Sequence, residues 1–262
     1  MSVHLDALAD EVFSAADAQA RGEGDAVRLF FGEVRRNPAY PDLFFLHGIA
    51  DLRAPDWTVT DLERIIAEHL PGLTRVRVSS RDPATIAGLG PRLAEAGSDA
   101  ERRVAMVQVA PPDGPGVGGP EVGLIESAAD WRAFEQLVGE DAREHGWTPA
   151  MTGQLVALYR WQAANQPQSW LLARASGDPV GRVGLYQHGT VGYLHALYTR
   201  ASARRRGVGS SLVWAVGERA RALGCERVTL QCTRDSFLPG FYRALGFRTV
   251  GEMWIWMKSA KR

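Results

Sequence analysis

The chain has 262 residues, of which 45% are hydrophobic, so it can bury a substantial core and wholesale disorder is not expected. Lys and Arg total 30 and Asp and Glu total 30, and this balance argues against a nucleic-acid or membrane-surface binder. The N-terminus does not read as a signal peptide, and no apolar run is long enough to span a bilayer. Cys225 and Cys232 border one predicted strand, too far apart for a disulfide. We therefore expect a cytoplasmic protein without nucleic-acid or membrane partners, and no Cys/His spacing predicts a metal site.

The first 110 residues alternate between helical and extended patterns. Apolar residues with a helical period mark three helices, and short runs rich in β-branched and aromatic residues mark four strands. In chain order we predict a helix over 5–19, strands over 26–34 and 43–52, a helix over 61–69, a strand over 74–79, a helix over 84–96 and a strand over 102–109.

Residues 111–120 combine proline and glycine at a density that continues neither a helix nor an internal strand. We predict a linker there, between a domain over 1–110 and a domain over 121–262. The second domain is predicted to contain a strand over 121–127, helices over 128–145 and 150–164, a hairpin of strands 169–175 and 180–188, a strand over 191–199, a helix over 207–223, a strand over 227–233, a short helix around 241–245 and a last strand around 253–256.

The run from Arg204 to Ser210 lies between the strand over 191–199 and the helix over 207–223. A helix N-terminus offers N–H groups and a partial positive charge to anions. Gly207 and Gly209 let phosphates approach the backbone, and the three preceding arginines add positive charge. Leu212 stands where a dinucleotide fingerprint needs a third glycine, and the turn has no P-loop lysine.

The remaining pattern, Arg-x-x-Gly-x-Gly after a strand, resembles the acetyl-CoA signature of the GNAT superfamily of N-acetyltransferases. Downstream, Phe241-Tyr242-Arg243-Ala244-Leu245-Gly246-Phe247 resembles a second element of that family. The resemblance covers about half the chain. It implies an α/β (α+β) fold with a mixed, mostly antiparallel twisted sheet flanked by helices, and acetyl-CoA as acyl donor.

The resemblance also implies which residues hold the cofactor. The backbone of the turn would cradle the pyrophosphate, and the end of the preceding strand would pair with pantetheine. The N–H of Leu197 would polarise the thioester carbonyl. Asp235 stands where the family often has Asn, and it can instead cap the short helix. The implied residues are Leu197, Tyr198, Thr199, Arg204, Arg205, Arg206, Gly207, Val208, Gly209, Ser210 and Asp235.

Tyr242 is the candidate general acid. Phe237, Phe241 and Leu245 share one face of the short helix and are expected to enter the core, whereas Tyr242 is rotated off that stripe toward the cleft. A phenol with a pKa of ~10 stays protonated at neutral pH and can donate to a leaving thiolate. The alternative is a half-buried tyrosine that anchors the helix.

The general base is less determined. His195 lies two residues before Leu197, so a regular strand would put both on one face, and imidazole suits a base. The alternative is a structural histidine. Glu126 and Glu252 are weaker candidates, and water is another.

The order of predicted strands and helices in the N-terminal half is similar to that in the latter part of the C-terminal half. Its matching strand-to-helix junction, residues 52–58, has no glycine and carries Asp56 where phosphates would lie. We read it as a degenerate GNAT-like half without a cofactor turn, or as an unrelated α+β domain. The aromatic side chains of Trp147, Tyr193, Trp254 and Trp256 could line an acceptor pocket or belong to the core.

We therefore predict an acetyl-CoA-dependent N-acetyltransferase in which a primary amine attacks the thioester directly. The acceptor would be a small-molecule or peptide amine, and the protein a monomer, as a tandem pseudo-dimer, or a homodimer. The rival is a catalytically inactive CoA-binding sensor or interaction protein.

Overall fold

The structure, a computed structural model, describes the chain except residues 1, 22–23, 111–113, 115–118 and 260–262. Most of the predicted linker over 111–120 therefore lies outside the described residues. Within the described part, no helix combines the length and apolarity needed to cross a membrane.

Contacts divide the chain into two compact units that differ from the expected division at 110 and 121. Unit 1 comprises Met1–Gln19, Ala105–Cys232 and Phe237–Val250, and unit 2 comprises Ala20–Val104, Thr233–Ser236 and Gly251–Arg262. The first helix, α1 (Ser2–Arg21), belongs to unit 1 up to Gln19.

Unit 2 contains a sheet whose strands follow the order β1-β2-β3-β4-β11. The single strand expected over 26–34 is wrong: these residues form an antiparallel hairpin in which Leu29 faces Gly32 across a two-residue turn. β3 and β4 run parallel, with Ile49 opposite Val78. The elements are β1 (Asp25–Leu29), β2 (Gly32–Arg36), η1 (Phe44–Leu46), β3 (Gly48–Ala50), α2 (Val59–His69), β4 (Arg75–Ser80), α3 (Pro83–Glu95), β5 (Asp99–Gln108) and β11 (Phe247–Ser259).

The core of unit 2 explains two of the aromatic residues singled out in the sequence. Trp256 is 1% exposed within the cluster formed with Leu62, Leu89 and Leu93, and Trp254 packs partly buried against the same cluster. The two indoles stack with centroids 6.0 Å apart. Trp254 and Trp256 are therefore core residues of unit 2.

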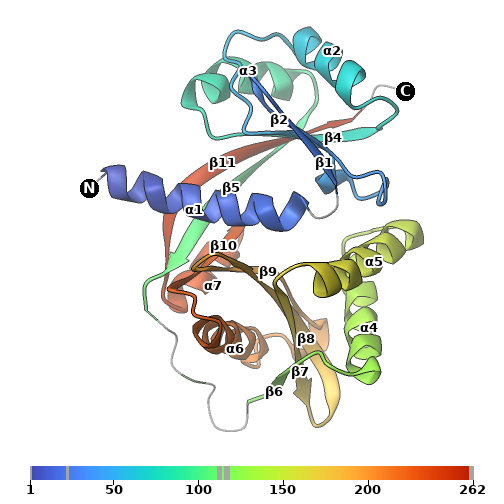
Figure 1. Ribbon diagram of the computed structural model, residues 1–262, viewed down its shortest axis with the longest axis vertical. Helices are drawn as coiled ribbons and strands as arrows, with labels where there is room; N and C mark the ends of the chain where they lie inside the picture. The colour runs from blue at the N-terminus through green and yellow to red at the C-terminus, as the bar shows by residue number, and fades with distance from the viewer. Residues whose placement is uncertain (1, 22–23, 111–113, 115–118, 260–262) are drawn as a thin grey trace. The chain divides into compact units, whose positions relative to one another are not determined.

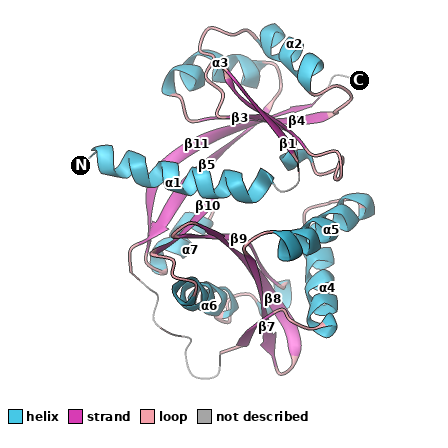
Figure 2. Cartoon of the chain, viewed as in Figure 1, coloured by secondary structure: helices cyan, strands magenta, loops and turns pink. Residues whose placement is uncertain are grey.

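In unit 1 the strand order is β5-β10-β9-β8-β7-β6. Helix α6 packs on β7, β8 and β9, while α4 contacts β8 and α5 contacts β7. Figure 2 shows α6 on one face of these strands and the α4–α5 pair on the other. The elements are β6 (Glu121–Leu124), α4 (Ala128–Glu144), α5 (Pro149–Asn165), β7 (Gln168–Ala175), β8 (Asp178–His188), β9 (Val191–Thr199), η2 (Ala201–Ala203), α6 (Val208–Ala222), β10 (Arg227–Thr233) and α7 (Leu238–Ala244).

The long strands β5 and β11, visible in Figure 1, explain why the units depart from the linear division. Trp254 to Ser259 of β11 pair with Arg75 to Ser80 of β4, deep in the N-terminal sequence. Conversely, β5 lies beside β10 in the sheet order. The last strand of each half of the sequence, β5 or β11, thus belongs partly to the unit formed mainly by the other half. Dividing the chain at residues 111–120 would separate both strands from strands with which they pair.

Candidate active site

The site is built where two parallel strands of unit 1 diverge. β9 and β10 pair from Val191 opposite Arg227 to Leu194 opposite Leu230, and the ladder ends there. β9 nevertheless continues to Thr199. Residues 195–199 thus lie beyond the β10 ladder, and the last three of them, Leu197, Tyr198 and Thr199, line a pocket.

A β-bulge marks the point of divergence. The register of β8 on β9 shifts between Arg182, opposite Tyr198, and Gly184, opposite His195. Ala196 has φ +52°, in the left-handed region that an alanine seldom adopts. The extra residue breaks the period of two, so the expectation that His195 and Leu197 share a face is wrong.

The buried guanidinium of Arg182 holds this bulge in place. Its side chain is 1% exposed, and Nη1 donates to the carbonyl of Ala196 at 2.6 Å. Nη2 donates to Oδ2 of Asp141 at 2.5 Å. Its centre lies 5.5–5.7 Å from the ring centroids of Phe134, Tyr159 and Tyr198. A buried charge needs such a partner, so Arg182 links the bulge to helix α4.

The sequence reasoning missed Arg182 and Asp141. The sequence did contain one indication. Arg182 is the single arginine in the otherwise apolar strand predicted over 180–188, and a buried arginine needs a counter-charge.

The predicted anion turn leads from β9 into α6. Arg205 has φ +62° and Gly207 has φ +80°, and Gly207 is the N-cap of α6 without a side-chain capping bond. When left-handed residues alternate with residues of negative φ, successive backbone N–H groups point toward one place and form an anion-binding concavity. A Cβ on Gly209 would lie 3.2 Å from the Phe241 ring, so the glycine keeps the mouth of the concavity open.

The end of β9 and the turn line a pocket of about 640 Å³. The pocket contains all the predicted cofactor residues except Arg206 and Asp235. From α4 and α7 it adds side chains that sequence reasoning did not assign to it. The lining residues are Asp141, Glu144, His145, Leu197, Tyr198, Thr199, Ala203, Arg204, Arg205, Gly207, Val208, Gly209, Ser210, Phe237, Leu238 and Phe241.

Asp235 does not cap the short helix, which corrects that expectation. Helix α7 begins at Leu238 with Phe237 as N-cap and no side-chain capping bond, so the N-cap lies beyond Asp235 in the chain. Asp235 instead pairs with Arg102 in unit 2, with Nη2 to Oδ1 at 2.8 Å.

The apolar stripe predicted for α7 is wrong at its first two positions, because Phe237, which is 78% exposed, and Phe241 both line the pocket. Tyr242, which was expected to face the cleft, is instead 5% exposed and is not among the residues that line the pocket. The Tyr242 ring packs against Phe241 and Phe247, with centroids 5.0 and 5.6 Å away. Burial raises the pKa of Tyr242, so the phenol keeps its proton throughout the neutral range.

His195 lies outside the pocket lining. Its Nε2 contacts Oε1 of Gln168 at 2.9 Å and its Nδ1 lies 3.5 Å from Nε2 of Gln19. Burial, and secondarily the charge of Arg182, lower the pKa of His195 to about 3. A ring so reluctant to take a proton is a poor base at neutral pH, which corrects the expected role. Tyr193 is likewise buried beside it, with ring centroids 6.0 Å apart.

Two carboxylates of α4 face the basic turn. Glu144 accepts a hydrogen bond from the Tyr198 hydroxyl at 2.8 Å and pairs with Arg204. Glu140 pairs with Arg200 at 2.8 Å. Hydrogen bonds from these arginines hold the pKa of both carboxyls below the usual range and raise the pKa of both guanidiniums, so all four groups are charged at neutral pH.

The last turn of α4 also carries an Asp–His pair into the pocket. Nδ1 of His145 lies 3.1 Å from Oδ1 of Asp141 and 2.9 Å from the Asp141 backbone carbonyl. A carbonyl only accepts, so Nδ1 carries the proton and Nε2 of the neutral ring is the basic nitrogen. The same aspartate pairs with Arg182, so the imidazole is connected to the bulge through Asp141 and Arg182.

The equivalent junction in unit 2 is closed. After the parallel strands β3 and β4, the N–H of Leu52 donates to the carbonyl of Ser79 at 2.8 Å and the N–H of Arg53 donates to the carbonyl of Phe31 at 2.8 Å. The strands therefore stay bonded where β9 and β10 separate, and these N–H groups are already used.

Comparisons with known proteins agree with this geometry. Residues 131–247 match the Acetyltransferase (GNAT) family. A stretch of 76 residues is 38% identical to glucosamine 6-phosphate N-acetyltransferase 1 of Oryza sativa subsp. japonica, covering 29% of this chain and 45% of that protein. The chain therefore spans less than half the length of this relative.

Two solved structures share the fold over nearly the whole chain. A functionally unknown conserved protein from Staphylococcus epidermidis ATCC 12228 gives a TM-score of 0.72 at 13% identity, over 92% of this chain and 96% of that one. A GCN5-related N-acetyltransferase from Kribbella flavida gives 0.63 at 18% identity, over 97% and 96%.

The fold and the family match define the class: a mixed α/β protein with the mostly antiparallel, helix-flanked sheet of GNAT proteins. More particularly, residues 131–247 are similar to the acetyltransferase domains of the GNAT family.

We predict that Arg182→Met lowers the free energy of unfolding by about 2 kcal/mol or more, because it removes the charged donor of the Ala196 carbonyl and of the partly buried Asp141. Arg160→Met is the matched control: Arg160 pairs with Glu135 at 2.5 Å and covers Trp131, but it is half exposed, and its loss should cost less than about 1 kcal/mol. Urea unfolding of both variants measures the difference, and equal losses would contradict the role given to Arg182.

Proposed function

We propose that the protein transfers the acetyl group of acetyl-CoA to a primary amine by direct attack. The observation that carries the proposal is the open end of β9 leading into the glycine-containing turn at the start of α6. The family match over residues 131–247 supports the same chemistry.

The residues of the pocket fit acetyl-CoA. The turn from Arg204 to Ser210 would hold the pyrophosphate with backbone N–H groups, and residues 197–199 would pair with pantetheine. When bound, acetyl-CoA supplies the acetyl group as an activated thioester. The N–H of Leu197, presented by the bulge at Ala196, would donate to the developing negative charge.

The Tyr242 hydroxyl is our candidate for the proton donor to the leaving sulfur. Burial keeps the phenol protonated, and its ring is fixed between Phe241 and Phe247. A fixed, protonated donor is what general-acid assistance requires.

We assign the base to His145 in place of His195. His145 lines the pocket, its Nδ1 proton is engaged by Asp141, and Nε2 is left as the acceptor for an amine proton. Asp141 would orient the ring, and Arg182 in turn fixes Asp141.

The acceptor class is a small-molecule or peptide amine. The matched rice protein is named for an amino sugar phosphate, which makes amino sugars one class to include in a test. The activity test is thiol release from acetyl-CoA over a panel of amines. Binding of acetyl-CoA without release with any amine would favour the inactive sensor over the enzyme.

Gly209→Asp should weaken acetyl-CoA binding at least about tenfold, because a carboxylate at the start of α6 opposes the pyrophosphate and the side chain meets Phe241. Asp56→Gly, the reverse change at the junction in unit 2, should leave the affinity unchanged. Calorimetric titration gives both constants, with melting temperatures as the check on folding. Equal affinity in wild type and Gly209→Asp would mean that the phosphates bind elsewhere.

Tyr242→Phe removes one hydroxyl and keeps the packed ring. If the hydroxyl protonates the leaving sulfur, kcat should fall by ~10²-fold while acetyl-CoA affinity changes little. Steady-state kinetics beside thermal melting separate the roles: a merely structural tyrosine would lower the melting temperature and leave turnover per folded molecule intact.

His145→Gln should lower kcat by ~10²-fold and leave the melting temperature unchanged, since the side chain is 65% exposed. His188→Gln is the control, because His188 lies in the same unit, bonds Ser14 at 3.3 Å and is absent from the pocket lining. Similar kcat values for the two variants would remove His145 from the mechanism.

A further inference from the structure

An exposed phenyl ring lines the pocket of unit 1. Phe237 is 78% exposed, although it contributes to the same pocket as the turn at the start of α6. Single apolar side chains are common on protein surfaces and by themselves indicate no function. Phe237 differs in its position, because a ligand that enters the pocket can remove the ring from water, which is favourable for an apolar group.

The backbone holds this ring beside the turn. Phe237 is the N-cap of α7, and its carbonyl accepts a hydrogen bond from the N–H of Phe241 at 3.1 Å. Phe241 also lines the pocket, and its ring would lie 3.2 Å from a Cβ on Gly209. Residues four apart lie on one face of a helix, so Phe237 and Phe241 together flank the start of α6.

The direction of α7 places Phe237 at the solvent end of the pocket. The exposed fraction falls from 78% at Phe237 to 5% at Tyr242, so the helix runs from the surface inward. In the proposed acetyl transfer, the thioester would lie at the inner end, beside the N–H of Leu197, and the pyrophosphate would lie on the turn. The part of CoA that continues outward from the pyrophosphate is the adenosine moiety.

The other Tyr and Phe side chains of the lining are already packed. Tyr198 is 6% exposed, and its hydroxyl donates to Glu144 at 2.8 Å. The Phe241 ring packs edge to face with the Tyr242 ring, with centroids 5.0 Å apart. Among these side chains, Phe237 is therefore the one with most of its surface open to a ligand.

A purine is the part of CoA that a phenyl ring suits. Its faces are flat and aromatic, and stacking on an aromatic side chain stabilises a bound base. The phosphates instead need N–H groups or guanidiniums, which the turn supplies. The pantetheine chain carries amides, which pair with strand backbone such as residues 197–199.

We propose that Phe237 binds the adenine ring of CoA by stacking, and so discriminates intact CoA from forms that lack the nucleotide. The proposal rests on the acetyl-CoA site proposed above and adds to it a residue that recognises the base. Phe237 would touch neither the thioester nor the acceptor amine, so it contributes to affinity and not to the chemical step.

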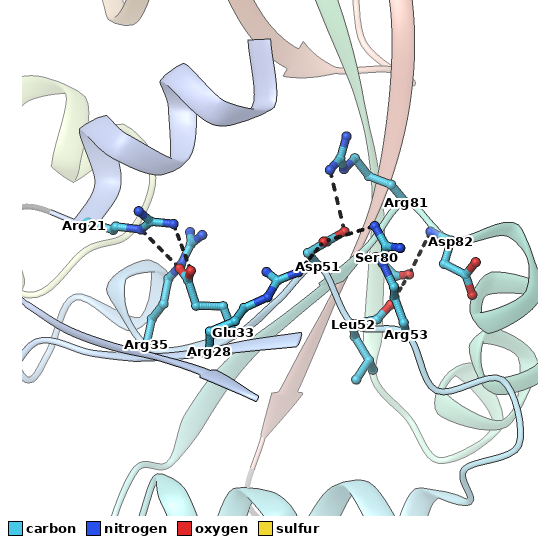
Figure 3. A network of polar contacts seen from close by, with 10 residues as sticks. All are labelled: Arg21, Arg28, Glu33, Arg35, Asp51, Leu52, Arg53, Ser80, Arg81 and Asp82. Atoms are coloured by element: carbon cyan, nitrogen blue, oxygen red, sulfur yellow. Dashed lines mark hydrogen bonds and ion pairs between the residues drawn. The ribbon is translucent and has the colours of Figure 1, made fainter. Parts of the chain in front are cut away.

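The matching junction of unit 2 is closed by side chains as well as by backbone (Figure 3). The Ser80 hydroxyl donates to the Leu52 carbonyl at 2.6 Å and accepts from the N–H of Asp82 at 3.1 Å. We therefore expect one CoA site per chain, and a change at Phe237 is measured on that site alone.

The test is calorimetric titration of the full chain with CoA and with 4′-phosphopantetheine, which lacks the adenine nucleotide and is measured by its displacement of CoA. Phe237→Ser should weaken CoA binding about tenfold, because it removes the stacked ring, and should leave the affinity for 4′-phosphopantetheine unchanged. Serine is a favoured N-cap residue, so this variant is expected to fold, and melting temperatures check that it does.

Two further variants need CoA alone and separate stacking from simple apolar contact. Phe237→Trp keeps an aromatic ring and should bind CoA at least as tightly as wild type. Phe237→Leu keeps an apolar side chain without a ring and should weaken binding several-fold. Phe30→Ser is the matched control: Phe30 is 91% exposed in unit 2 and absent from the pocket lining, so its loss should leave CoA affinity unchanged.

The proposal is overturned if wild type binds CoA and Phe237→Ser binds it equally well, or if Phe237→Leu and Phe237→Trp bind it alike. An equal loss for CoA and 4′-phosphopantetheine would assign Phe237 to the pantetheine chain and overturn the proposal too. If 4′-phosphopantetheine displaces no CoA even from wild type, the Trp and Leu variants decide. A wild type that binds no CoA would contradict the proposed function itself, which is a different result from these.

Discussion

The buried guanidinium of Arg182 is the contact on which the pocket of unit 1 depends. It bonds the Ala196 carbonyl on one side and Asp141 on the other, so one side chain fixes both the bulge in β9 and the last turn of α4. The bulge separates β9 from β10 and turns Leu197 toward the ligand space, and the last turn of α4 brings His145 to the same pocket. An apolar residue of similar size could fill the space but could not supply two donors, and a neutral amide would lack the positive charge that pairs with Asp141.

The two units use a related strand arrangement in opposite ways. In each unit a parallel strand pair is joined through a helix, and a residue with φ near +50° lies within the first strand (Ala196) or just after it (Asp51). In unit 1 the strands separate beyond Leu194, and a glycine-containing turn follows. In unit 2 the N–H of Leu52 closes onto Ser79, and the turn carries arginine and aspartate side chains instead. Backbone N–H groups at the junction are therefore already bonded in unit 2, whereas in unit 1 the junction lines the pocket.

The sequence predicted what local patterns determine. The turn around Gly207 and Gly209, the helix after it and the strand before it lie where expected, because capping, periodicity and glycine placement are local properties. The exchange of β5 and β11 was not predictable, since a period of two identifies a strand but not its partner. The bulge at Ala196 was missed because no glycine marks it, and its misreading placed His195 in the site. Phe237 was misread as core because an apolar side chain at a pocket mouth carries the same pattern as one inside.

Part of the positive charge around the turn of unit 1 is neutralised before any ligand arrives. Glu140 and Glu144 each hold one arginine, so the positive charge suggested by the sequence is partly neutralised within the domain. In the proposed complex a pyrophosphate would therefore compete with Glu144 for Arg204, and its affinity would depend more on backbone N–H groups than on the arginine side chains. This balance follows from α4, whose carboxylates are placed one turn apart on the face toward the turn. The same helix, α4, thus orients the candidate base His145 and places Glu144 against Arg204 of the proposed cofactor site. The two parts of the pocket are therefore connected through one helix.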